Sequence, residues 1–308
     1  MKTVLLLNNV DKSCGVQQWG IRFGNIVTKS QKYNIVYREL SSYNEYYLLI
    51  TTIKPDIIVY NYHIDLMRWL TRASLYGQCR NIAIVHEGFS HLNDNIGFDE
   101  YIYLPQNVET GGKVFTIGRA LLDYNGTYKI NSVPTIGSFG FGFPHKQYPL
   151  IVSKVCEEFD KAHIRFNMPY HFKADTNGKS AIIESELCRR NITKPGITLE
   201  ITHDFLSEDD NLKFLADNDI NAFFYDNSKL DSSSGATDFA LSVDRPIVIT
   251  NSPMFRHLTD VIGTNICIDN NTITSIIERG TAILQPLKDK WSRARLLSEF
   301  EDILGYVQ

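Results

Sequence analysis

Short runs of apolar, often β-branched residues alternate along the chain with longer segments in which apolar residues recur at helical spacing. This alternation is typical of βαβ units, in which helices connect parallel strands. In the first part of the chain it predicts strands at 4–8, 34–38, 56–60, 81–86 and 101–104. Helices are expected between them, notably over 16–28 and 64–75. The fold class is therefore expected to be α/β.

The alternation stops in a polar, turn-rich stretch at 123–134 and then begins again. The second series predicts strands at 135–139, 164–167, 197–202, 221–225, 246–250 and 265–268, and helices at 148–159, 180–190, 209–217 and 236–243. The restart predicts two Rossmann-like domains, 1–130 and 131–290, that face each other across a cleft.

The last segment, from Thr272 onward, has a helical pattern with a break near Gln285 and Pro286. Its final part, 291–308, is expected to be a C-terminal helix. Two placements are open for this helix, packing back on the first domain or lying on the outside of the second.

The bulk properties fit a two-domain folded protein. At 308 residues the chain exceeds the size at which a single core usually stops growing. With 43% hydrophobic residues, 21% charged residues and a net charge of -4, the composition excludes a disordered chain and a generally basic nucleic-acid binder.

The cysteines and the apolar runs bear on the compartment. The five cysteines are scattered, odd in number and never in a C-x-x-C pair, so neither a disulfide framework nor a zinc site is expected. The apolar run 4–7 is too short for a signal peptide, and no later run approaches the ~20 residues of a membrane span. We therefore expect a cytoplasmic protein with no transmembrane segment.

One candidate ligand loop is Thr135-Ile-Gly-Ser-Phe-Gly-Phe-Gly-Phe-Pro-His-Lys146, between a predicted strand and a predicted helix. Parallel sheets bind ligands at this position. The spacing is neither that of a dinucleotide fingerprint nor that of a P-loop. Glycines such as Gly140 and Gly142 let backbone N–H groups approach an anion, and Lys146 supplies a positive charge. The alternative is a simple connection between the domains.

A second candidate loop is Asp231-Ser-Ser-Ser-Gly-Ala-Thr-Asp238, which follows a strand and enters a short apolar helix. Exposed N–H groups and hydroxyls at a helix start form an anion site. The residues concerned are Ser233, Ser234, Gly235, Ala236 and Thr237. The alternative is ordinary N-capping of the helix.

Together, these stretches resemble the C-terminal half of GT-B glycosyltransferases, most closely the large retaining family 4, which includes sucrose and mannosyl transferases. The segments that carry the resemblance are 136–146, 222–227 and 232–246, followed by a strand and Asn251-Ser-Pro-Met-Phe255. In such enzymes the two loops bind the diphosphate of a nucleotide-sugar. The resemblance thus implies donor-diphosphate contacts from Gly140, Gly142, Lys146 and residues 233–237.

Other residues receive roles from their places in the same pattern. Gly15 and Val16 follow the first strand, like the glycine-containing loop that faces the donor sugar in this family. His86 and Glu87 end a later strand where family members often carry an active-site histidine, and they are the candidate catalytic residues. Asn61 and Asp238 are candidate cleft-lining residues, and Lys173 and Tyr225 are candidate nucleotide contacts.

The sequence also departs from the family pattern. The family's acidic E-x7-E pair is absent, because Phe239 stands seven residues before Pro246, where the second glutamate is expected. Asp231 and Asp238 are spaced one residue too closely to replace the pair. Ser138 stands where the family has an arginine.

The resemblance implies a nucleotide-sugar-dependent glycosyltransferase of the hexosyltransferase type, with retention of configuration and without a required metal or other cofactor. UDP-, GDP- and ADP-sugars are all open as donors, as is the acceptor: a glycan, a lipid-linked sugar, a nucleic acid base or a small molecule. The oligomeric state is open too. Two alternatives are a non-catalytic nucleotide-sugar-binding module, which the missing acidic pair favours, and another GT-B activity such as a nucleotide-sugar epimerase.

Overall fold

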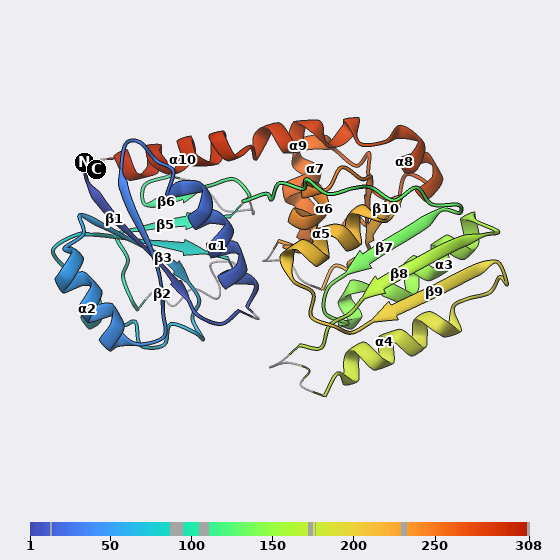
Figure 1. Ribbon diagram of the computed structural model, residues 1–308, viewed down its shortest axis with the longest axis horizontal. Helices are drawn as coiled ribbons and strands as arrows, with labels where there is room; N and C mark the ends of the chain where they lie inside the picture. The colour runs from blue at the N-terminus through green and yellow to red at the C-terminus, as the bar shows by residue number, and fades with distance from the viewer. Residues whose placement is uncertain are drawn as a thin grey trace. The chain divides into compact units, whose positions relative to one another are not determined.

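The computed structural model describes residues 1–12, 14–86, 95–104, 111–171, 175, 177–228 and 233–306. The chain divides into two compact units. Unit 1 consists of Met1–Leu121, Asp231–Ser233 and Lys290–Gln308, and unit 2 of Leu122–Leu230 and Ser234–Asp289. Each unit contains one parallel sheet with helices packed on it (Figure 1). The predicted class, α/β with two Rossmann-like domains, is confirmed.

The sheet of unit 1 has the strand order β2-β1-β3-β4-β5-β6, and neighbouring strands are parallel throughout. The strands are β1 (Thr3–Asn9), β2 (Asn34–Leu40), β3 (Ile57–Tyr62), β4 (Arg80–Val85), β5 (Glu100–Tyr103) and β6 (Val114–Thr116). The helices are α1 (Gly15–Val27), α2 (Tyr43–Ile53) and, from the C-terminal segment, α10 (Arg293–Gly305).

Alternating side chains of these strands fill two cores, one on each face of the sheet. One face packs Val4, Leu6, Val59 and their neighbours against α1 and α10. The other packs Leu5, Tyr60 and further residues against α2. Successive strand residues point to opposite faces, so the continuous apolar run 4–7 of β1 supplies both cores.

Helix α10 is fixed to unit 1 by both apolar and polar contacts. Figure 1 shows α10 in red alongside α1. Between these two helices, the Phe300 ring meets the Phe23 ring edge-on, with centroids 4.9 Å apart. Arg80 forms an ion pair with Glu100 and donates to the carbonyl oxygens of Ile303 and Leu304 at 2.8 Å each. These carbonyls belong to the last turn of the helix, where backbone acceptors lack helical partners, so Arg80 caps α10.

The sheet of unit 2 has the strand order β11-β10-β7-β8-β9, again parallel. Its strands are β7 (Thr135–Phe139), β8 (Ala162–Asn167), β9 (Ile197–Thr202), β10 (Ile220–Phe223) and β11 (Ile247–Ile249). Its α-helices are α3 (Tyr148–Glu158), α4 (Lys179–Arg190), α5 (Glu208–Ala216), α6 (Ala236–Ser242), α7 (Arg256–Ile262), α8 (Ile273–Arg279) and α9 (Gln285–Lys290).

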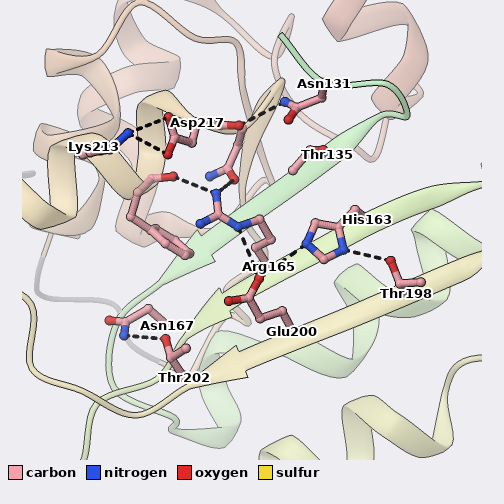
Figure 2. Close-up of polar contacts among 12 residues, drawn as sticks. Asn131, Thr135, His163, Arg165, Asn167, Thr198, Glu200, Thr202, Lys213 and Asp217 are labelled. Atoms are coloured by element: carbon pink, nitrogen blue, oxygen red, sulfur yellow. Dashed lines mark hydrogen bonds and ion pairs between the residues drawn. The ribbon is translucent and has the colours of Figure 1, made fainter. Parts of the chain in front are cut away.

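A polar cluster joins α5 to the sheet of unit 2 (Figure 2). Arg165 of β8 donates to Asn218 Oδ1 at 3.0 Å, and its guanidinium carbon lies 4.7 Å from the centre of the Phe214 ring. The same guanidinium lies 3.7 Å from the Glu200 carboxylate of β9. A Cβ on Gly137 would come within 1.8 Å of Asn218 Nδ2. The first glycine of the 135–146 loop is therefore required by packing.

Two local predictions were wrong. Residues 64–75 form turns and a short 3-10 helix, Arg72–Ser74, because buried Met67 and Leu70 are three residues apart, a spacing that i→i+3 turns also satisfy. Residues 265–268 contribute only a bridge, Ile249 to Cys267. The predicted break near Gln285 and Pro286 is confirmed, because α8 ends at Arg279 and α9 begins at Gln285, with Pro286 in its first turn.

Helix α2 was missed because only Tyr46 and Ile50 of its eleven residues are buried. Its start carries a recognisable signal: Ser42 accepts from the Glu45 N–H, and the Glu45 carboxylate accepts from the Ser41 N–H. Within the described part of the chain, no helix is both long enough and apolar enough to cross a membrane.

Candidate functional site

A chain of buried and half-buried polar side chains runs across unit 1 where four parallel strands end. His86 Nε2 lies 2.6 Å from Asn61 Oδ1, and Asn61 Nδ2 donates to Asn8 Oδ1 at 2.8 Å. Asn8 Nδ2 donates in turn to the Tyr37 hydroxyl at 2.8 Å, which donates to Glu39 at 2.8 Å. The chain thus links the ends of β4, β3, β1 and β2, the edge at which parallel sheets bind ligands.

The first turn of α1 is tied into the same chain. Asn61 Nδ2 also donates to the Val16 carbonyl at 2.7 Å, and Asn8 Nδ2 to the Gln17 carbonyl at 2.9 Å. Gly20 allows this approach, because a Cβ there would lie 2.4 Å from Asn61 Nδ2 and 2.5 Å from Asn8 Nδ2. The two amide groups therefore occupy the space that a side chain at position 20 would need.

His86 is a neutral imidazole in this environment. Its ring meets the Trp19 ring edge-on, with centroids 4.9 Å apart. Burial, followed by the positive charges of Arg119, His63 and Arg22, lowers the pKa of His86 to about 3. The side chain therefore carries no charge at neutral pH and interacts through hydrogen bonds.

Arg119 connects this region to the residues before α6. It is almost fully buried, at 2% exposure, and its Nη1 donates to the Ser233 hydroxyl at 2.7 Å. The positive charge of Arg119 also contributes to the lowered pKa of the His86 imidazole. The Arg119 guanidinium thus contacts Ser233 and is one of the positive charges that lower the pKa of His86.

In unit 2, Lys146 and Gly140 lie together just after β7. Gly140 has a backbone φ of +125°, and a Cβ on it would come 2.3 Å from Lys146 Nζ. The Tyr148 hydroxyl donates to the Gly140 carbonyl at 2.7 Å, and the Gly140 N–H donates to the Asn167 carbonyl at 3.0 Å. The loop is thus held by its own hydrogen bonds with the ammonium group against it.

The Lys146 ammonium rests on aromatic rings. Its Nζ lies 5.5 Å from the centre of the Tyr225 ring and 5.8 Å from that of Phe141. Among the described residues, no carboxylate lies within ion-pair distance of it. A half-buried ammonium held this way is available to a negatively charged ligand.

The turn before α6 is fastened by Ser234 and Thr237. The Ser234 N–H donates to the Met254 carbonyl at 3.3 Å, and its hydroxyl donates to the Tyr225 hydroxyl at 3.1 Å. Thr237 Oγ1 donates to the Ser234 carbonyl at 2.7 Å and lies 3.1 Å from His257 Nε2. These two buried residues shape the turn, and Gly235 is its exposed residue.

This chain is similar to known proteins in its three-dimensional structure and not in its sequence. No protein-family model and no curated protein matches the sequence. Solved structures match over the whole chain. HepE (Alr3699) of Anabaena, in complex with UDP and glucose, is 9% identical, with a TM-score of 0.67 and 100% of both chains covered.

Two further structures give the same result. The sucrose-phosphate synthase of Thermosynechococcus elongatus is 8% identical, with a TM-score of 0.68, covering 99% of this chain and 98% of its own. A glycosyltransferase of Rickettsia africae ESF-5 is 11% identical, with a TM-score of 0.67 and 99% of each chain covered. The chain has the GT-B fold. The resemblance drawn from the second-half motifs is confirmed at the level of the fold, which is what similarity at such identities shows.

Within the GT-B fold, the candidate residues fall into two groups. In unit 1, His86 and Asn61 are hydrogen-bonded to each other, and the Val16 carbonyl accepts from Asn61. Gly15 is the exposed first residue of α1, and no atom lies within 4 Å of a Cβ built on it.

In unit 2, Lys146 lies against Gly140 and over Tyr225, which bonds to Ser234. Gly142 is buried, and its missing side chain is replaced by Ala181 of α4, whose Cα would lie 2.5 Å from a Cβ at position 142. Of the remaining candidates, Ala236 begins α6, Asp238 is buried within it, and Glu87 and Lys173 lie outside the described residues.

The structure adds residues that the sequence did not single out, namely Asn8, Tyr37, Glu39, Arg22 and Arg119. Asn8 had a detectable signal, since an asparagine at the end of an otherwise apolar strand marks the ligand-binding edge of a parallel sheet. Arg119 had none, because its partner Ser233 lies 114 residues away in the sequence.

Proposed function

We propose that this protein is a glycosyltransferase that transfers a sugar from a nucleotide-sugar donor. The observation that carries the proposal is the Lys146 ammonium, placed beside Gly140 at the end of β7 in a chain that has the GT-B fold over its full length. A cation at this edge of a parallel sheet suits the diphosphate of such a donor. HepE, which shares the fold, was crystallised with UDP and glucose.

In this proposal Lys146 binds the donor diphosphate and stabilises the charge that develops when the sugar leaves. Gly140 leaves room for the Lys146 ammonium, and Gly142 is proposed as a backbone contact of the diphosphate. The turn from Ser233 to Thr237 is proposed to contribute backbone N–H groups beside the exposed Gly235. Tyr225 lies beneath Lys146 and fixes its direction, and Lys173 is a further nucleotide contact.

His86 serves as a neutral group that orients the sugar. An imidazole with a pKa near 3 is a poor base at neutral pH, and its Nε2 is already occupied by Asn61. This favours a retaining reaction in which the leaving phosphate accepts the proton of the acceptor hydroxyl. For an inverting reaction, Glu87 is the remaining candidate base. Gly15, Val16, Asn61 and Asp238 line the region of the donor sugar.

The test is nucleoside diphosphate binding by Lys146→Ala, measured by calorimetry with UDP, GDP and ADP. Loss of one charge-assisted contact is expected to weaken binding about 10- to 100-fold. Lys154→Ala is the matched control, because Lys154 is an α3 lysine paired with Glu157 at 2.6 Å. If both variants bind the nucleoside diphosphates with equal affinity, Lys146 is not part of the site and the proposal fails.

The role assigned to Lys146 also predicts that turnover does not depend on a divalent cation. Nucleotide release by the wild-type protein should be the same in EDTA and in Mg²⁺. A rate that disappears in EDTA would show that a metal ion, and not Lys146 alone, stabilises the leaving diphosphate.

A further inference from the structure

The amide groups of Asn61 and Asn8 have only one orientation that satisfies their neighbours. Asn61 lies beside the Val16 carbonyl at 2.7 Å, and Asn8 beside the Gln17 carbonyl at 2.9 Å. A backbone carbonyl only accepts hydrogen bonds, so each side chain must turn its NH₂ group toward it. The oxygen of Asn61 is then the atom that faces His86.

The orientation of Asn8 is fixed independently at its other side. Its Oδ1 accepts from Asn61 Nδ2 at 2.8 Å and from the Asn9 N–H at 3.0 Å. Its Nδ2 donates to the Tyr37 hydroxyl, which donates a hydrogen bond to the Glu39 carboxylate. Gln17 Nε2 donates to the same carboxylate at 2.8 Å. Reversing the Asn61 amide would therefore place its oxygen against the Val16 carbonyl oxygen and against Asn8 Oδ1. Both contacts would be repulsive, with no water to relieve them at a buried amide.

We propose that Asn61 is a positioning residue that holds His86 as the Nε2–H tautomer, through a hydrogen-bond chain that ends on the carboxylate of Glu39. The Asn61 oxygen can only accept, so the proton between the two side chains belongs to His86. His86 Nδ1 is then a lone pair.

This assignment defines the chemistry that His86 recognises. In this tautomer Nδ1 accepts hydrogen bonds and does not donate them, so it suits a hydroxyl group and repels a phosphate oxygen. The inference rests on the proposed function only where it concerns turnover. The tautomer itself is a property of unit 1 without any ligand.

The direct test is two-bond ¹H–¹⁵N correlation NMR of the histidine rings in full-length, ¹⁵N-labelled protein, with the His86 signals assigned from His86→Gln. We expect a single Nε2–H tautomer in the wild type. A wild-type Nδ1–H tautomer would overturn the proposal without needing any variant of Asn61.

Asn61→Ala and Asn81→Ala form a matched pair. Asn81 is also buried in unit 1 and also makes three hydrogen bonds, to the Tyr60 hydroxyl and to the carbonyls of Tyr76 and Cys79. It lies at the opposite end of the sheet, at the start of β4. Asn61→Ala should give a mixture of His86 tautomers, and Asn81→Ala should leave the single tautomer of the wild type. A single Nε2–H tautomer in Asn61→Ala would contradict the proposal.

Turnover separates positioning from a general loss of structure. With the donor that the wild type uses, Asn61→Ala should lower kcat about 10- to 100-fold and leave KM for the donor nearly unchanged. Asn81→Ala should keep both constants near the wild-type values. Equal kcat losses in the two variants would reject the positioning role. If the wild type turns over no nucleotide-sugar, the proposed function fails, and the tautomer measurement still decides the assignment of Asn61.

Discussion

Replacing Gly20 with alanine tests how closely α1 packs on the buried amides of unit 1. A Cβ at this position would lie 2.4 Å from Asn61 Nδ2 and 2.5 Å from Asn8 Nδ2. Non-bonded contacts of this kind normally stay at about 3.5 Å, so the helix or the amides must move by about 1 Å. The perturbation therefore acts on the same hydrogen bonds that hold His86.

The magnitude follows from three contributions. Overpacking a filled interior costs about 1–3 kcal/mol. A buried amide that loses its partner costs about 1–3 kcal/mol more. Alanine offsets about 1 kcal/mol of this through its better helix propensity. We expect Gly20→Ala to lower the free energy of unfolding of unit 1 by about 1–5 kcal/mol.

The assay is urea unfolding followed by tryptophan fluorescence. The three tryptophans, Trp19, Trp69 and Trp291, all belong to unit 1, so the signal reports this unit alone. Gly15→Ala is the control in the same helix, because a Cβ at position 15 meets no atom within 4 Å. If the two variants have the same free energy of unfolding, the packing argument is refuted.

Three further predictions concern other parts of the molecule. Gly140→Ala should weaken UDP binding at least about tenfold in calorimetry, because its Cβ would occupy the place of Lys146 Nζ; unchanged affinity would contradict this. Unit 1 should lose stability as the pH falls from 6.5 toward 3, by up to about 1.4 kcal/mol per pH unit, because the unfolded chain protonates His86 and the folded one does not. His86→Gln should flatten this slope in acid titrations of unfolding, and equal slopes would count against the lowered pKa. Arg80→Ala should destabilise unit 1 by about 3–5 kcal/mol in the fluorescence assay, since it uncaps α10 and breaks a buried ion pair. Arg68→Ala, which removes an exposed pair, should cost less than about 1 kcal/mol, and similar losses in both would contradict that account.

The parts of the fold that the sequence predicted are those fixed by local periodicity. Strands such as β1 and β3 contain short apolar runs, and their alternation with helices specifies parallel sheets. Helix α2 was missed because two buried residues give too weak a pattern. Segment 64–75 was assigned to a helix because apolar spacing does not separate an α-helix from consecutive turns.

The candidate site was only partly accessible to the same reasoning. Lys146 and His86 stand out because they follow strands at the ligand-binding edge of a parallel sheet. The chain from His86 to Glu39 joins the ends of four strands, and the contact of Arg119 with Ser233 spans 114 residues. Such contacts depend on strand order and register, which local sequence does not specify.

The central claim is that the protein uses a nucleotide-sugar. The most direct measurement is nucleotide release from a panel of UDP-, GDP- and ADP-sugars, followed by mass spectrometry with the wild-type protein and with Lys146→Ala. We predict that the wild type releases the nucleoside diphosphate from at least one donor and that the variant does so much more slowly. Binding of a donor without any release would contradict the claim and would identify the protein as a nucleotide-sugar-binding module.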